Sequence, residues 1–391
     1  MSFIPIAAEK DAPWGLAALP PLALYIHVPW CVRKCPYCDF NSHEVKIRLP
    51  EDDYLAALIA DLEAALPLVW NRPVHSIFIG GGTPSLLSGA GVDRLLMAIR
   101  ARLPLAPDAE ITLEANPGTA EAEKFAAFAA AGVNRLSLGI QSFDDAKLHA
   151  LGRIHNGADA QRAIELARRH FAAINLDLMY GLPNQTLAEA RRDLDTAIAF
   201  APGHLSAYHL TLEPNTAFHQ APPPLPDDEL CADMQEMVEA NLAAAGYQHY
   251  ETSAFARPGR RCAHNLNYWR FGDYLGIGAG AHSKLSFHDG IRREARPRHP
   301  RDYLADPVSR SWQDIDRAEL PFEFMMNALR LCDGVETRLF AERTGLPLAV
   351  VADALRDAGR DGLLTATPER IAPTPRGQRF LNELLRRFLR D

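Results

Sequence analysis

Short apolar runs alternate with longer amphipathic patterns along the first half of the chain. Each run is bounded by Gly, Pro or Asn and is rich in branched or aromatic residues, which is typical of buried strands. The runs cover residues 22–28 (LALYIHV), 74–80 (VHSIFIG), 109–115 (AEITLEA), 135–141 (RLSLGIQ), 174–180 (INLDLMY) and 204–210 (HLSAYHL). The patterns between them, such as DDYLAALIADLEAAL, place apolar residues at helical spacing. Six successive strand–helix units predict an α/β fold whose parallel sheet is covered by helices.

Polar and glycine residues stand at the carboxyl end of nearly every predicted strand. They are the cysteine-containing loop after residue 28, the stretch Gly80–Thr83, Glu114, Gln141 and Asp177. Barrel enzymes build their sites on this face, so the pattern favours a barrel-type arrangement. Open doubly wound sheets use the same edge, and the pattern therefore locates a site better than it separates the two folds.

The second half of the chain changes character after a Pro-rich stretch, APPPLPDDE (221–229). A helical pattern from Asp227 to about Ala245 follows, and then a segment dense in aromatics and glycine (247–283) and a basic, loop-like segment (291–303). From about Pro321 the pattern reads helix, turn, helix, short hairpin, helix, which resembles a small winged-helix module. We therefore expect an N-terminal extension (1–21), a core (22–220), an extension (221–319) and a winged-helix-like α+β domain (320–391).

Charge and cysteine usage limit the class of protein. The chain has 41 Lys and Arg against 49 Asp and Glu, a formal charge of −8, which argues against a nucleic-acid-binding protein. No apolar run approaches the roughly 18 residues that span a bilayer, and the N-terminus lacks a secretory pattern. We expect a cytoplasmic protein. Clustered cysteines are more often metal ligands than disulfides in that compartment.

Three of the six cysteines fall within eight residues, with the spacing Cys-x3-Cys-x2-Cys: Cys31, Cys35 and Cys38. Thiolates ligate iron–sulfur clusters, and a four-iron cluster held by three of them leaves one iron open to a small molecule with an amine and a carboxylate. The alternatives are a zinc site completed by His27, Asp39 or His43, or a chance cluster of thiols.

Motifs around this loop carry a resemblance to a known family. CVRKCPYC after the first strand and GGGTPS after the second resemble the radical S-adenosylmethionine (SAM) superfamily. Within it, YIHVPWCVRKCPYCDF, FIGGGTPSLL, LEANPG, RLSLGIQSF, LGRIH, NLDLMYGLP and HNLNYW resemble the oxygen-independent coproporphyrinogen III oxidase group, and most closely its HemW branch, the haem chaperones. Seven motifs in one order make the resemblance specific.

The resemblance implies a partial (β/α)6 TIM-type barrel that holds a [4Fe-4S] cluster on Cys31, Cys35 and Cys38 and SAM beside it. It implies that Gly81, Gly82 and Thr83 meet the SAM amino group, that Glu114, Gln141, Arg153 and Asp177 line the SAM pocket, and that Tyr25 and Tyr37 are cofactor neighbours. Each residue also has a local reading: the glycines could form a tight turn, Arg153 could be a surface charge, and the tyrosines could be core residues. Burying a carboxylate without a partner costs free energy, so carboxylates at the ends of buried strands favour a ligand-binding site that supplies the partner.

Two features separate the chaperones from the oxidases. The oxidases carry a fourth cysteine two residues after the third, where this chain has Phe40. The HNLNYW motif marks the chaperone branch, and its His264 is the expected haem ligand, with Cys262 as an alternative. A buried hydrogen bond is the plain alternative for His264. The basic run Arg292–Arg301 could meet haem propionates or form a solvated loop.

The sequence thus predicts a haem chaperone that binds a [4Fe-4S] cluster, SAM and haem and passes haem to acceptor proteins. Further expected partners are an electron donor for the cluster and, through the acceptors, a peripheral contact with a membrane. The rival function is an oxygen-independent coproporphyrinogen III oxidase, which decarboxylates its substrate to protoporphyrinogen IX. Whether the chain turns SAM over as an enzyme stays open.

Overall fold

The computed structural model describes residues 15–46, 48–118 and 122–389 of the 391-residue chain. The expected N-terminal extension (1–21) therefore lies largely outside the described residues. All six predicted strands are present at nearly the predicted positions. They are β1 (Leu22–Val28), β4 (Val74–Gly81), β5 (Leu105–Ala115), β6 (Arg135–Gln141), β7 (Ala173–Tyr180) and β8 (His204–His209).

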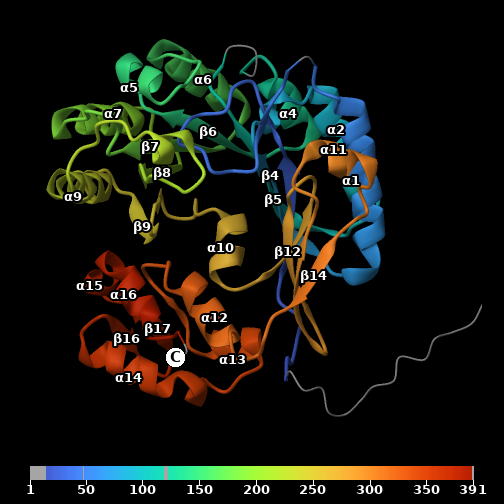
Figure 1. The fold of residues 1–391 in the computed structure, drawn as a ribbon, viewed down its shortest axis with the longest axis vertical. Helices are drawn as coiled ribbons and strands as arrows, with labels where there is room; N and C mark the ends of the chain where they lie inside the picture. Colours follow the sequence, from blue (N-terminus) through green and yellow to red (C-terminus); the bar gives the residue numbers. More distant parts are fainter. Residues whose placement is uncertain (1–14, 47, 119–121, 390–391) are drawn as a thin grey trace, which may run out of the picture.

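These strands form the parallel centre of one large sheet. Within the described residues the sheet has 12 strands, in the order β14-β13-β12-β11-β1-β4-β5-β6-β7-β8-β10-β9. The pairs from β1 to β8 are all parallel, as strand–helix units require. The sheet curves into a partial barrel with helices outside it (Figure 1). The predicted α/β partial barrel is confirmed.

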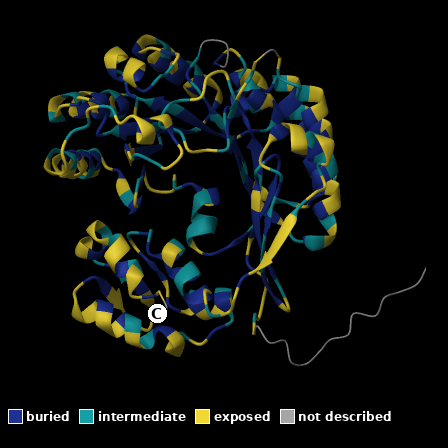
Figure 2. Ribbon diagram, viewed as in Figure 1, coloured by how far each residue is buried: buried dark blue, intermediate teal, exposed yellow. Residues whose placement is uncertain are grey.

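The outer helices bury one face against the sheet. Ser88, Asn156, Thr186 and Asp227 cap helices through their side-chain oxygens, so local sequence defines where these helices begin. The apolar core lies between these helices and the strands, which run dark through the centre in Figure 2. The helices are α1 (Glu51–Ala65), α2 (Gly89–Arg100), α4 (Phe125–Ala131), α5 (Asp145–Ala150), α6 (Gly157–His170), α7 (Leu187–Ala199), α8 (Ala217–Gln220) and α9 (Asp228–Ala244).

The segment after α9 extends the sheet at both ends. One edge gains β10 (Ala254–Ala256) and β9 (Gln248–Glu251), and β11 (Asp273–Ile277) pairs in parallel with β1 at the other. Antiparallel β12 (His282–Phe287), β13 (Gly290–Ala295) and β14 (Ser311–Asp314) follow β11. Two helices belong to this region, α10 (Ala263–Trp269) and α11 (Pro300–Ala305).

The basic segment 291–303 is therefore not the loop that its composition suggested. Its arginines are compatible with a strand because acidic partners neutralise them: Arg292 pairs with Asp289 and Asp314, and Arg293 pairs with Glu323. Arg296 is 2% exposed and bonds Asp61 of α1 and Glu294. Local composition could not show these partners, which are mostly distant in sequence.

The C-terminal part folds in the predicted order (Figure 1). It has its own apolar cluster. That cluster also includes Tyr250, Phe271 and Ile291, so it reaches back before residue 320, and the proposed domain boundaries stay a prediction. No helix in the described part of the chain has both the length and the apolar character that a membrane span requires. The elements are α12 (Leu320–Ala328), β15 (Val335–Glu336), α13 (Arg338–Thr344), α14 (Ala352–Arg360), β16 (Leu364–Ala366), β17 (Arg370–Pro373), α15 (Pro375–Arg379) and α16 (Leu381–Arg386).

Candidate cluster and cofactor site

A cavity of about 350 Å³ lies at the carboxyl ends of the parallel strands. We call it the cysteine cavity. All the sequence-predicted cluster and SAM residues line it except Tyr25: Cys31, Cys35, Tyr37, Cys38, Gly81, Gly82, Thr83, Glu114, Gln141, Arg153 and Asp177. The structure thus brings together residues that are up to 146 positions apart in the sequence. This agrees with the expectation that the site forms where the carboxyl ends of the parallel strands meet.

The cysteine loop follows β1 and is held by short strands. Cys31 ends β2 (Trp30–Cys31), which pairs with β3 (His43–Glu44), and the Cys38 amide donates to the Cys35 carbonyl at 3.1 Å. Burial raises the pKa of the Cys31 and Cys38 thiols. Three thiols on one cavity wall fit a cluster held by three protein ligands, because cluster binding replaces the proton of each thiol by iron.

The alternative of a zinc site with His27 fits less well. The His27 ring is fully engaged: Nε2 donates to the Asn41 carbonyl at 2.8 Å, so Nδ1 accepts from the Tyr25 hydroxyl at 2.9 Å. Among the described residues, no group of three or more His, Cys, Asp or Glu side chains could hold a single metal ion. The donor set therefore matches a larger iron–sulfur group better than one zinc ion.

The glycine stretch is attached to the cysteine loop through its backbone. Gly82 N donates to Val28 O and Thr83 N to Trp30 O, both at 2.7 Å. Gly81 has a φ of +114°, and a Cβ there would lie 2.6 Å from the His27 ring. A cationic amino group only donates hydrogen bonds, so the glycines would meet it through their carbonyl oxygens. Glycine is needed because the backbone passes so close to its neighbours.

Two carboxyl groups face the cavity from adjacent parts of the sheet. Glu114 accepts from Gly81 N at 3.1 Å, and burial together with the nearby Asp177 raises its pKa to about 8. Asp177 accepts from Ser137 Oγ and Asn175 Nδ2, each at 2.8 Å, and burial also raises its pKa. A cationic ligand with hydroxyl groups would stabilise the ionised form of both carboxyl groups, through its charge and through hydrogen bonds, and would thereby lower their pKa values.

Arg153 supplies positive charge beside the cysteines. Its Nη1 lies 3.5 Å from Cys35 Sγ, and its Nη2 donates to Asn116 Oδ1 at 2.6 Å and to Gly139 O at 3.0 Å. The buried Nε has no hydrogen-bond partner among the described residues. A buried donor without a partner beside a cavity suits an anionic group of a ligand, such as a carboxylate.

Sequence reasoning missed several residues of this site. Asn116 donates to Thr83 Oγ1 at 3.0 Å and accepts from Arg153, so it connects the glycine stretch with the arginine. Ser137 and Tyr208 also line the cavity. Asn116 and Ser137 lie within motifs quoted above, and alternation along β5 and β6 could have identified Asn116, two residues after Glu114, and Ser137, four before Gln141.

Two sequence-predicted residues lie elsewhere. Tyr25 lines a neighbouring cavity that shares Phe40, Gly81 and Glu114 with the first. His264 lines neither cavity: it is 1% exposed, its Nδ1 is bonded to Ser76 Oγ at 3.0 Å and its Nε2 to Tyr268 Oη at 3.2 Å. Burial lowers its pKa to about 3. Cys262 is 3% exposed and contacts Glu110, with its pKa raised to about 12.

Comparison with known proteins shows the family. Residues 25–197 match the Radical SAM superfamily, and residues 315–380 match the HemN C-terminal domain. The heme chaperone HemW of Escherichia coli is 52% identical over 378 residues, which cover 96% of this chain and 100% of that protein. HemW of Haemophilus influenzae is 50% identical over 379 residues, covering 95% and 99%.

A solved structure shows the same fold. The structure of coproporphyrinogen III oxidase (HemN) from Escherichia coli, a radical SAM enzyme, matches with a TM-score of 0.80 at 24% identity, over 95% of this chain and 90% of that chain. At this identity the likeness concerns the fold alone. By its sequence identity with the relatives above, the chain belongs to the HemW family of the radical SAM superfamily.

Proposed function

We propose that this chain is a haem chaperone that binds a [4Fe-4S] cluster, SAM and haem and passes haem to acceptor proteins. One observation carries the proposal: about half of all positions are identical to heme chaperones named HemW over nearly the whole chain. The radical SAM family implies a [4Fe-4S] cluster and SAM, and the cysteine cavity offers donors suited to both.

Each cofactor has residues suited to hold it. Cys31, Cys35 and Cys38 would ligate the cluster, Arg153 would pair with the SAM carboxylate, and Glu114 and Asp177 would accept hydrogen bonds from its amino and hydroxyl groups. When bound and reduced, a cluster of this class would supply one electron to the SAM sulfonium. The protein's own part would be to hold and orient SAM beside the cluster through Arg153, Glu114 and Asp177.

Phe40 supports the chaperone over the oxidase. It replaces the cysteine that the oxidases carry, and its side chain, 59% exposed, lines both cavities without a donor atom. The likeness to the oxidase structure concerns the fold, so it gives no independent support for that reaction. We further propose that the protein acts in the cytoplasm, where an electron donor and haem acceptors, some of them at membranes, are its partners; its charge of −8 speaks against nucleic acid.

Two assays on one anaerobic preparation test the function. The cluster-loaded protein is titrated with haem, and it is separately given coproporphyrinogen III, SAM and a reductant. We expect saturable haem binding and no protoporphyrinogen. Formation of protoporphyrinogen, or haem binding no stronger than that of an unrelated control protein, would overturn the proposal.

A further inference from the structure

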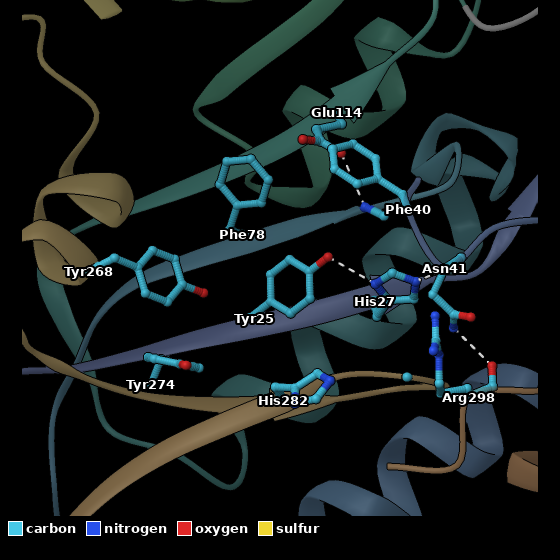
Figure 3. A pocket seen from close by; sticks show the side chains of 12 residues that line it. Tyr25, His27, Phe40, Asn41, Phe78, Glu114, Tyr268, Tyr274, His282 and Arg298 are labelled. Atoms are coloured by element: carbon cyan, nitrogen blue, oxygen red, sulfur yellow. Dashed lines mark hydrogen bonds between the residues drawn. The ribbon is translucent and has the colours of Figure 1, made fainter. Parts of the chain in front are cut away.

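A second cavity, of about 590 Å³, adjoins the cysteine cavity. We call it the aromatic cavity. Its walls include Tyr25 of β1, Phe78 of β4, Tyr268 of α10 and Tyr274 of β11 (Figure 3). The volume is typical of a cofactor site, and flat aromatic walls suit a large planar ring.

Of the HNLNYW motif, Tyr268 lines this cavity and His264 does not. Tyr268 presents its ring to the cavity, whereas His264 lies behind it and bonds its hydroxyl through Nε2 at 3.2 Å. Phe78 packs against His264 with ring centroids 5.1 Å apart. His264 therefore has the contacts of a residue that positions the aromatic wall.

His282 differs from the other two histidines of this region. It lies at the start of β12, is exposed, and lines the cavity beneath Tyr25 in Figure 3. Among the residues that the structure describes, neither of its ring nitrogens has a hydrogen-bond partner, whereas both nitrogens of His27 and His264 are engaged.

Arg298 differs in the same way from the other arginines of its segment. Arg292, Arg293, Arg296 and Arg301 each pair with at least one carboxylate. Arg298 also lines the cavity, and in the described part of the chain its guanidinium has no ion-pair partner. Its backbone carbonyl accepts from Asn41 Nδ2 at 2.8 Å, which fixes the segment against the cysteine loop. An unpaired guanidinium at the mouth of an apolar cavity suits a carboxylate.

We propose that the aromatic cavity is the haem site, with His282 as the axial ligand of the iron and Arg298 as the partner of a propionate. This inference rests on the proposed function and states where in the protein haem binds. The ligand chemistry is specific: an aromatic wall for the macrocycle, one imidazole for the metal and one cation for a carboxylate. A metal-free substrate with four propionates would make no use of the imidazole and would leave three carboxylates without an arginine from this cavity's lining.

The test is haem titration of cluster-loaded full-length protein, followed by absorption and magnetic circular dichroism. His282→Ala should alter the haem spectrum and weaken binding at least tenfold, and adding imidazole to His282→Gly should restore the spectrum. The matched control is His288→Ala, an exposed histidine just beyond the other end of β12, which should leave both unchanged. His264→Ala should keep the axial-ligand signature and lower affinity only through the displaced Tyr268.

The proposed pairing of Arg298 with a haem propionate is tested by comparing haem with its dimethyl ester. Arg298→Ala should weaken binding of haem several-fold but not binding of haem dimethyl ester, in which both carboxylates are masked. Arg301→Ala is the control from the same segment, because Arg301 is exposed and paired with Asp302.

Wild-type affinity and spectrum in His282→Ala, together with their loss in His264→Ala, would refute the assignment while leaving the chaperone function intact. Absence of haem binding by the wild-type protein would refute the function itself. Cluster content, SAM affinity and circular dichroism of each variant show that it is folded.

Discussion

The two cavities lie side by side, yet they are built from different parts of the chain. The cysteine cavity draws its polar residues mostly from loops and strand ends of the parallel core, and most of them lie inside a short motif. The aromatic cavity joins β1 and β4 to α10, β11, β12 and Arg298, which come about 190 or more residues later. The first cavity can be found from local sequence because topology brings strand ends together. The second depends on one tertiary pairing, of β11 with β1.

The largest effect should come from the cysteines of the first cavity. Replacing Cys31, Cys35 or Cys38 by Ala should abolish cluster assembly, because the two remaining thiolates are too few to hold a four-iron cluster. Iron and sulfide analysis after anaerobic reconstitution should give about four iron atoms per chain for the wild type. Cys231→Ala and Cys332→Ala, which lie outside the cavity, should keep the cluster. Stoichiometric zinc without an iron chromophore would contradict this view of the site.

The next effect concerns His264, the buried histidine behind the Tyr268 wall of the aromatic cavity. His264→Ala removes a buried ring and two hydrogen bonds, so we expect a loss of about 2–4 kcal/mol in the free energy of unfolding. His282→Ala should change it by less than about 0.5 kcal/mol, because that side chain is exposed. Chemical denaturation of both variants measures the difference. Equal stability of the two variants would show that the hydrogen bonds of His264 to Ser76 and Tyr268 do not stabilise the fold.

The contrast between buried His264 and exposed His282 illustrates which features the sequence could predict and which it could not. All six core strands are identifiable from their apolar period, and the eleven expected cluster and SAM residues other than Tyr25 are identifiable from strand ends and motifs. All eleven line the cysteine cavity. Motif membership alone could not show that His264 points into the interior behind Tyr268. Nor could composition show that Arg292, Arg293 and Arg296 have carboxylate partners, whereas Arg298 has none among the residues that the structure describes. Burial and pairing at these positions depend on which distant elements become neighbours.

A third prediction sharpens the assignment of SAM to the first cavity. Glu114→Ala, Asp177→Ala and Arg153→Ala should each weaken SAM binding, because each removes a charge-assisted hydrogen bond worth about 1.5–3 kcal/mol, or roughly ten- to a hundredfold in affinity. Calorimetry on cluster-loaded protein measures this. Glu165→Ala, an exposed residue of α6, serves as the control. Three variants with wild-type affinity would show that SAM binds elsewhere.

The smallest expected effect is a pH dependence of stability that arises from Glu114, which lines both cavities. Glu114 has a pKa of about 8 in the folded chain against an ordinary value of 4.5. Between these values the folded state binds more protons than the unfolded state, so this group makes stability fall as pH rises, and the fall levels off only once pH has passed through the folded pKa.

Glu114→Gln removes this titration. From pH 6 to pH 8 the wild type should therefore lose about 2 kcal/mol of stability relative to the variant, measured by denaturation of SAM-free, cluster-loaded protein. Glu165→Gln provides the matched exposed control. Saturating SAM should flatten the wild-type slope, because a cationic ligand beside Glu114 stabilises its carboxylate and lowers its pKa. Parallel curves for wild type and Glu114→Gln without SAM would show that the carboxyl group is already ionised, and that the cavity is more polar than its burial indicates.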